Sequence, residues 1–201
     1  SMCDRCVWLE AGKVIMDGSP FEVTEAYREN VRSKEEQKML ELFRKRTGKK
    51  SFDERLSLEE LVFKDEGGNS RRIFDAGEKV NACLKLSSTE AISSVNFSMT
   101  FHRTDGNVLL DLDSRFDNVD LGVFDGECEI EIGLGPINFG QDTYEVHVEA
   151  YLQIDSEKHV LATIDEVLKV EKPTTLRDDP ALFTELDWTM DYVGPSERHN
   201  E

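Results

Sequence analysis

Cysteine and histidine are the residues of this chain best suited to metal or redox chemistry. Cys3 and Cys6 form a C-x-x-C pair, whereas a structural zinc site needs four ligands. No second pair follows, because Cys83 and Cys128 stand alone, and the four histidines show neither H-x-H nor H-x-x-x-H spacing. We therefore expect no metal and no cofactor, and we interpret the cysteines as small apolar side chains in a reducing compartment.

Two glycine-containing segments resemble nucleotide-binding loops, but neither meets the requirements of one. Gly48–Ser51 ends like a P-loop, yet the position six before Lys49 is not glycine, and a helix is expected before the segment rather than after it. Residues 133–136 carry a proline where a dinucleotide-binding turn needs a free N–H group. The chain also lacks a G-x-S-x-G nucleophile turn. The sequence therefore disfavours both nucleotide binding and serine-hydrolase chemistry.

Paired carboxylates are the remaining candidates for catalysis. Asp111 and Asp113 are two residues apart, so on a strand both would face the same side and could serve as the acid and base of a glycosidase. An ordinary solvated strand face explains the same pattern with fewer assumptions. We expect the chain not to be an enzyme, and glycan processing remains an alternative.

Charge and composition limit the partners. The 201 residues include 24 basic and 42 acidic side chains, which gives a net charge of −18 and would repel the phosphates of nucleic acid. No run approaches the roughly 18 consecutive apolar residues of a spanning helix, and the N-terminus lacks the pattern of a signal peptide. A hydrophobic content of 38% suffices for a packed core. We expect a soluble protein, with one domain of ordinary size plus an appendage.

The charge is distributed in three blocks. Residues 1–27 carry a net charge of −3, residues 28–50 of +5 and residues 51–201 of −20. A basic block between two acidic ones indicates a junction, because one compact body usually intersperses its charges. We therefore divide the chain into an N-terminal part, residues 1–50, and a C-terminal domain, residues 51–201.

The N-terminal part begins with two β-prone runs, residues 6–10 and 13–18, separated by a short glycine-containing turn. The tetrapeptide 19–22, S-P-F-E, then supplies an N-cap serine, a proline at the first helical position and a glutamate at the third. We predict a β-hairpin followed by a helix, or a pair of helices, from Pro20 to about Arg46.

The C-terminal domain shows a different hydrophobic period. From residue 56 onward the apolar residues alternate with a period of two, and Asp105-Gly106 between two such runs is a strong hairpin signal. About seven short strands without a convincing helix predict an antiparallel β-sandwich of the immunoglobulin-like or jelly-roll type. The predicted strands are residues 55–64, 78–86, 95–102, 108–116, 127–132, 143–154 and 159–170.

The alternation also predicts which side chains face away from the core. Tyr144, Val146 and Val148 are expected to point inward, which places their neighbours on the outer side. That side is rich in amides, hydroxyls, carboxylates and imidazoles, which can bind sugar hydroxyls while planar side chains stack on sugar rings. On the pattern alone, an ordinary wet face is the simpler interpretation. The residues expected on the outer side include Asn96, Ser98, Thr100, His102, Glu145, His147, Glu149, Tyr151 and Gln153.

Several segments resemble a known family. Residues 3–20, C-D-R-C-V-W-L-E-A-G-K-V-I-M-D-G-S-P, resemble the closing stretch of an ABC transporter nucleotide-binding domain, in the tryptophan form typical of polysaccharide exporters. Three further segments are similar to the C-terminal domain of the Wzt-type ATP-binding subunit of O-antigen exporters. They are F-D-A-G-E-K-V at 74–80, F-H-R-T-D-G at 101–106 and Y-E-V at 144–146. Cys6 departs from the branched apolar residue usual at its position.

The resemblance implies the end of an ATPase, a linker and a cytoplasmic carbohydrate-binding β-sandwich. Such a domain recognises the finished, often terminally modified O-antigen polysaccharide, at its non-reducing end, before export through the permease subunit at the inner face of the inner membrane. The Walker A, signature and Walker B segments are absent, so this chain should not hydrolyse ATP although its parent would. Family members tend to form homodimers by exchanging C-terminal strands, which would use residues 183–192. The alternative is a dimerisation or regulatory appendage of an ABC ATPase without glycan affinity.

The resemblance also implies that one sheet binds glycan, and we combine this with the predicted outer face. Tyr151 is expected to stack on a sugar ring, while Arg115 and the carboxylates bind hydroxyl groups. Tyr144, by contrast, resembles the family's buried strand tyrosine. The expected glycan-binding residues are His102, Asp111, Asp113, Arg115, His147, Glu149, Tyr151 and Gln153.

Overall fold

The computed structural model describes residues 3–171 and 187–191. The chain divides into two compact units, Ser1–Phe43 and Arg44–Glu201. This division lies within the basic block, a few residues before the boundary expected at residue 50. Each unit is described separately below.

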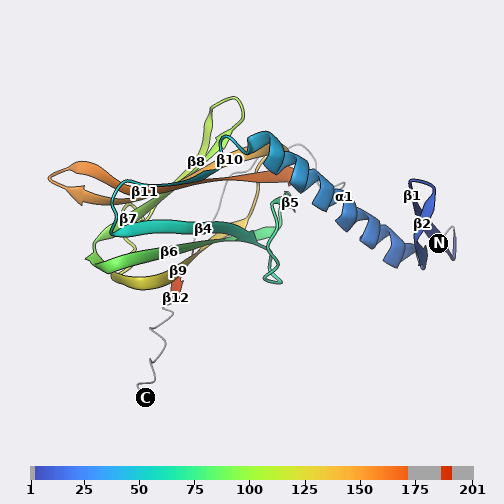
Figure 1. Ribbon diagram of the computed structural model, residues 1–201, viewed down its shortest axis with the longest axis horizontal. Helices are drawn as coiled ribbons and strands as arrows, with labels where there is room; N and C mark the ends of the chain where they lie inside the picture. The colour runs from blue at the N-terminus through green and yellow to red at the C-terminus, as the bar shows by residue number, and fades with distance from the viewer. Residues whose placement is uncertain (1–2, 172–186, 192–201) are drawn as a thin grey trace, which may run out of the picture. The chain divides into compact units, whose positions relative to one another are not determined.

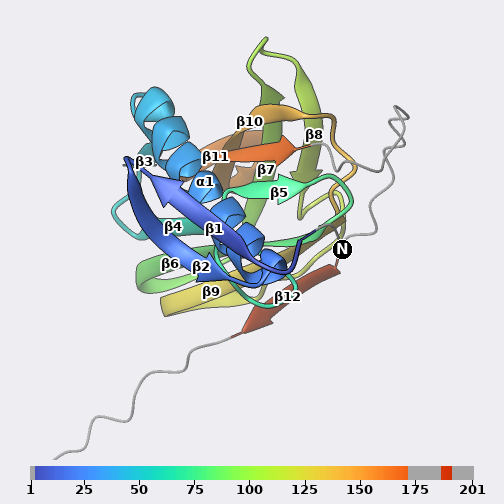
Figure 2. The same cartoon turned by 90° about the vertical axis from the view of Figure 1, so that its right-hand side faces the viewer.

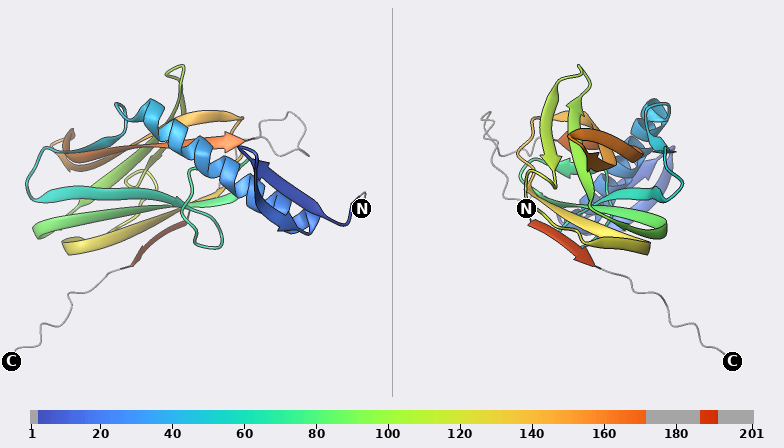
Figure 3. Two further views of the ribbon diagram at one scale, coloured as in Figure 1. Left: turned by 45° about the vertical axis from the view of Figure 1, so that its right-hand side comes forward. Right: turned by 90° about the vertical axis from the view of Figure 1, so that its left-hand side faces the viewer.

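The first unit is a hairpin followed by a helix, as expected. Strands β1 (Cys6–Glu10) and β2 (Lys13–Gly18) pair antiparallel, and α1 spans Pro20–Phe43. The hairpin leads directly into the helix (Figure 3), and Trp8 of β1 meets Tyr27 of α1 edge to face, with ring centroids 5.6 Å apart. The helix ends three residues before the predicted Arg46.

The start of α1 is set by a capping box. The Ser19 hydroxyl accepts a bond from the Glu22 N–H at 3.4 Å, and the Glu22 carboxylate accepts one from the Ser19 N–H at 3.3 Å. Two N–H groups at the helix start thus have partners. Val23, one turn into the helix, is 2% exposed, so the cap and the buried face begin together.

The second unit is a β-sandwich, and the predicted fold class is confirmed (Figures 1 and 2). The first sheet has the order β3-β11-β10-β7-β8, with β5 pairing parallel to β11, and the second has the order β12-β9-β6-β4. The strands of the first sheet are β3 (Gly48–Ser51), β5 (Ile73–Asp75), β7 (Val95–Arg103), β8 (Val108–Asp113), β10 (Asp142–Ile154) and β11 (Glu157–Glu171). Those of the second are β4 (Leu56–Lys64), β6 (Lys79–Ser93), β9 (Val123–Pro136) and β12 (Asp187–Asp191).

The core lies between the two sheets and is held by aromatic contacts. Phe97 of β7 meets Phe124 of β9 edge to face at 5.6 Å, which links the two sheets. Phe139 contacts both Phe101 and Tyr144 in the same way. Tyr144 is 2% exposed and donates its hydroxyl to the Gly140 carbonyl at 2.6 Å, so the inward direction predicted for it is confirmed.

The β10–β11 hairpin sets the register of the outer face. Its turn residues Asp155 and Ser156 have φ values of 48° and 70°, the left-handed conformation of a two-residue turn that matches the strand twist. A bulge then shifts the pairing, because Tyr151 is opposite Val160 whereas Ala150 is opposite Ala162. From Ala162 to Val170, each residue of β11 therefore pairs with a β10 residue one position nearer the turn than it would without the bulge.

The remaining groups with possible chemistry are free thiols. Cys83 and Cys128 are buried, and burial raises the pKa of both thiols. Within the described ranges no group of three or more histidine, cysteine or acidic side chains is arranged to hold a metal ion. The helix that the structure describes is not apolar enough over a sufficient length to cross a membrane.

Candidate functional site

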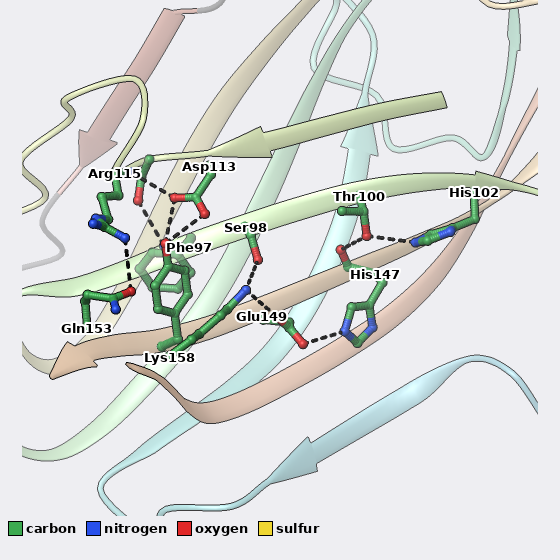
Figure 4. A network of polar contacts seen from close by, with 12 residues as sticks. Phe97, Ser98, Thr100, His102, Asp113, Arg115, His147, Glu149, Gln153 and Lys158 are labelled. Atoms are coloured by element: carbon green, nitrogen blue, oxygen red, sulfur yellow. Dashed lines mark hydrogen bonds and ion pairs between the residues drawn. The ribbon is translucent and has the colours of Figure 1, made fainter. Parts of the chain in front are cut away.

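The outer side of the first sheet carries the residues expected to bind glycan. Ser98 of β7 pairs with Asp113 of β8 on one side and with Glu149 of β10 on the other. The three strands therefore bring these side chains onto one face of the sheet. Figure 4 shows the polar network that results. The residues on this face are His102, Asp111, Asp113, Arg115, His147, Glu149, Tyr151 and Gln153.

Tyr151 lies on the expected face, but its expected role as an open stacking platform is wrong. The residue is 2% exposed, and the Lys158 ammonium lies above the ring, 4.3 Å from the centroid. Its hydroxyl donates to the Asp113 carboxylate, with both oxygens 2.7 Å away. Burial and this hydrogen bond both raise the pKa of Tyr151. Tyr151 is therefore a buried residue of this face that orients the Asp113 carboxylate.

Lys158 connects the Tyr151 end of the network to its centre. Its Nζ donates to the Ser98 hydroxyl at 3.0 Å and forms an ion pair with Glu149 Oε2 at 2.5 Å. Burial alone would raise the pKa of Glu149, but the hydrogen bonds from Lys158 and His147 outweigh it and hold this pKa below its ordinary value. Glu149 is therefore an ionised acceptor.

His147 lies between two carboxylates. Its Nδ1 is 2.5 Å from Asp165 Oδ1, and its Nε2 is 3.2 Å from Glu149 Oε1. The hydrogen bond with Asp165 makes the largest contribution to a raised His147 pKa, and burial opposes it. Only the imidazolium can donate both bonds at once, so the network favours the charged form.

A hollow of about 360 Å³ opens at the other end of the face. Imidazole, guanidinium and carboxylate groups surround it, and the volume falls in the range of about 300–1,000 Å³ that is usual for small-molecule sites. Arg46 pairs with Glu145, while Arg103 Nε donates to Asp142 Oδ2 at 3.1 Å. The residues that line the hollow include Arg46, His102, Arg103, Glu145, His147 and Asp165.

The predicted residues thus have four different settings. Asp113, His147, Glu149 and Tyr151 belong to the central network, whereas His102 lines the hollow and bonds Thr100 Oγ1 through Nε2 at 3.0 Å. Two others form an exposed pair, in which Arg115 Nη1 donates to Gln153 Oε1 at 3.1 Å. Asp111 is exposed on the edge strand β8.

Sequence reasoning missed three contributors, for identifiable reasons. Lys158 lies opposite Gln153 because of the two-residue turn, which its Asp155-Ser156 composition only weakly signals. Asp165 lies opposite His147 only because of the bulge. Arg46 was visible as a basic residue, but no local pattern indicated that it would line the same hollow as His102.

Comparison with known proteins identifies the family of the domain that carries this surface. Residues 50–183 match the family model described as Wzt C-terminal domain, and no curated protein matches the chain. Among solved structures the chain is similar to the "Crystal structure of the C-terminal domain of wzt", with a TM-score of 0.55 and 10% identity over 75% of this chain and 86% of that one. At this identity the likeness shows a shared fold.

A second solved structure is a Niemann-Pick type C2 protein from Japanese carpenter ant, with a TM-score of 0.42 and 10% identity over 61% of this chain and 98% of that one. That similarity is too low to support an argument. The family match, by contrast, spans the sandwich from β3 to beyond β11 and agrees with the observed fold. The chain belongs to the Wzt C-terminal domain family.

Proposed function

We propose that this chain is the carbohydrate-binding module of a polysaccharide ABC exporter and that it recognises an O-antigen type glycan before export. The observation that carries the proposal is the polar outer face of the first sheet, which leads into the hollow lined by His102 and Arg103. Family membership supports a carbohydrate-binding role in such a transporter. Recognition of a terminally modified, non-reducing end is the finer part of the proposal.

The proposed contacts are hydrogen bonds from fixed side chains to sugar hydroxyls. His102 and Arg103 supply donors at the hollow, and the ionised Glu149 supplies acceptors at the centre. Because His147 and Lys158 already hold Glu149, little side-chain entropy is lost on binding. Each new bond replaces one with water, so we expect modest affinity.

The length of the face suits a chain of several sugars rather than a single one. His147 and Gln153 lie on the same strand, six positions apart. At about 3.3 Å per residue this separation corresponds to roughly 20 Å. A polysaccharide lying along β10 would therefore contact both the hollow and the Arg115–Gln153 pair.

The proposal is of binding without catalysis. Asp113 is engaged by the Tyr151 hydroxyl, which leaves Asp111 and Asp113 poorly arranged as a free acid and base. In the full-length parent, the first unit would belong to the ATPase and a permease subunit would receive the glycan. We place the module on the cytoplasmic side of the inner membrane.

A homodimer is the second part of the proposal. β12 pairs antiparallel with the edge of β9, and an exchanged strand would use the same edge of a partner copy. Residues 183–186 and 192, which complete the segment expected to exchange, lie outside the described residues. The alternative function, a dimerisation appendage without glycan affinity, rests on this strand alone.

The test is a titration with the polysaccharide of the protein's own source and with an unrelated one, followed by calorimetry or chemical-shift perturbation. We expect selective binding to the protein's own glycan, with shifts on β7 and β10, and a loss of about two- to tenfold in affinity for Arg103→Ala. Lys85→Ala is the matched control, because Lys85 pairs with Glu60 on the second sheet. Absence of binding to either glycan, with a dimer seen by sedimentation, would favour the appendage.

A further inference from the structure

Stacking of a sugar ring on the outer face would require an exposed aromatic side chain, which Tyr151 does not provide. Tyr151 is 2% exposed, whereas Phe116, in the turn that follows β8, is 76% exposed. We propose that Phe116 is the stacking platform for a pyranose ring of the bound polysaccharide. This inference rests on the proposed glycan-binding function and adds a residue and a contact chemistry to it.

The turn that carries Phe116 is firmly anchored to the sheet. Ser114 is fully buried, its N–H donates to the Phe97 carbonyl at 2.9 Å, and its hydroxyl accepts from the Phe97 N–H at 2.9 Å. The Asp113 carbonyl accepts from the Phe116 N–H at 3.0 Å, and the Asp113 carboxylate accepts from the Arg115 N–H at 3.0 Å. The backbone under the exposed ring is therefore fixed before any ligand arrives.

The anchor also ties the turn to the central network. Asp113 holds the turn by its carbonyl and by one carboxylate oxygen, and the same carboxylate receives the Tyr151 hydroxyl. Tyr151 is in turn covered by Lys158, which pairs with Glu149. Through Asp113, the buried Tyr151 therefore helps to position the turn that carries the exposed Phe116.

The neighbours of Phe116 suit a sugar. The Arg115 guanidinium lies 5.7 Å from the Phe116 ring centroid and is held by Gln153. A pyranose has faces of C–H groups and an equatorial rim of hydroxyls, so a ring on Phe116 would place hydroxyls near a guanidinium and an amide. A single exposed apolar side chain is ordinary on protein surfaces; the fixed turn and the adjacent planar polar groups distinguish this one.

A protein contact is the competing use of an exposed aromatic ring. Specific protein interfaces bury about 1,200–2,000 Å² and have apolar centres with few charges. In the sequence Phe116 instead lies between Arg115 and Asp117, and its N–H donates to the Asp113 carbonyl. The charges around the ring favour a hydroxyl-rich ligand over a protein surface.

The experiment measures affinity for the protein's own polysaccharide with Phe116→Ala, Phe116→Trp and Phe52→Ala. Phe52 is the matched control because it is an exposed phenylalanine, 65% accessible, that follows β3. We expect Phe116→Ala to weaken binding about three- to tenfold, Phe116→Trp to retain or strengthen it, and Phe52→Ala to leave it unchanged. Melting temperatures should remain within error, since the replaced ring is exposed.

The outcomes separate this inference from the function on which it depends. If the wild-type chain binds the glycan and Phe116→Ala binds equally well, the platform is refuted and the proposed function stands. If Phe116→Ala binds the glycan normally but changes the sedimentation coefficient, the ring belongs to a protein interface. If the wild-type chain does not bind its own glycan, both proposals fail.

Discussion

His147 gives the outer face a dependence on pH. The imidazolium is held between Asp165 and Glu149, which raises the His147 pKa above its ordinary value of about 6.5. A raised pKa in the folded state stabilises the protein fully below the unfolded pKa, and this stabilisation is lost as the pH rises through the folded pKa. We expect the free energy of unfolding to decline as the pH rises from about 6.5, and His147→Gln to lack this decline.

Urea unfolding at a series of pH values checks this prediction. The exposed His159 on β11 provides the control, because His159→Gln leaves the Asp165–His147–Glu149 arrangement intact. An equal pH dependence in His147→Gln and the wild-type chain would contradict the role of His147.

The facing of these residues could be predicted from the sequence, but their accessibility could not. Strict alternation on β10 places His147, Glu149 and Tyr151 on one side whatever surrounds them. Tyr151 is buried, and one of the groups over its ring is Lys158, which reaches it across the hairpin from the next strand. Such a contact depends on register and on the side-chain conformation of a distant residue, and no local pattern contains either.

At the scale of elements, long alternating strands were predictable and short ones were not. β10 buries alternate side chains over most of its length, and β7 and β11 each bury many apolar residues, whereas β3 is four exposed residues, G-K-K-S, and β5 is three residues long. The two short strands form because β11 offers them an edge to pair with. They are consequences of the tertiary structure, and their own residues carry little β signal.

The turn of the β10–β11 hairpin can be tested on its own. Ser156 has φ of 70°, a conformation that costs an L-residue free energy and glycine almost none. We expect Ser156→Gly to increase the free energy of unfolding by about 0.5 kcal/mol, because the relief of strain exceeds the added entropy of the unfolded chain.

Denaturant unfolding provides the measurement for this variant. Ser87→Gly is the control, since Ser87 lies within β6, where glycine should lower stability by about 0.5–1 kcal/mol. A loss of stability in Ser156→Gly as large as that in Ser87→Gly would show that the left-handed turn is not present in solution.

At the scale of the molecule, the excess of acidic residues opposes folding. Residues 51–201 carry a net charge of −20, which the sequence alone gives, although Lys64–Glu129 at 3.1 Å and Lys85–Glu60 at 2.7 Å relieve some repulsion. Surface pairs contribute little each, so net repulsion should dominate. We expect the free energy of unfolding to rise as sodium chloride increases from about 0.02 to 0.5 M, because salt screens the repulsion.

Thermal or urea unfolding across that salt range checks whether the free energy of unfolding rises with salt. If the free energy of unfolding falls with salt instead, the ion pairs outweigh the net charge. Sucrose, which adds no ions, serves as the control for general effects of cosolute on the folded state.

The edge of β9 with which β12 pairs is synthesised before β12 itself. β9 is made well before β12, at about 5–20 residues per second, so the β9 edge is open for a few seconds in every nascent chain. An open edge accepts any strand of matching sequence. Neighbouring ribosomes on one messenger would hold several such edges close together, so the share of exchanged pairs would reflect how fast the protein is made as well as how tightly the two forms bind.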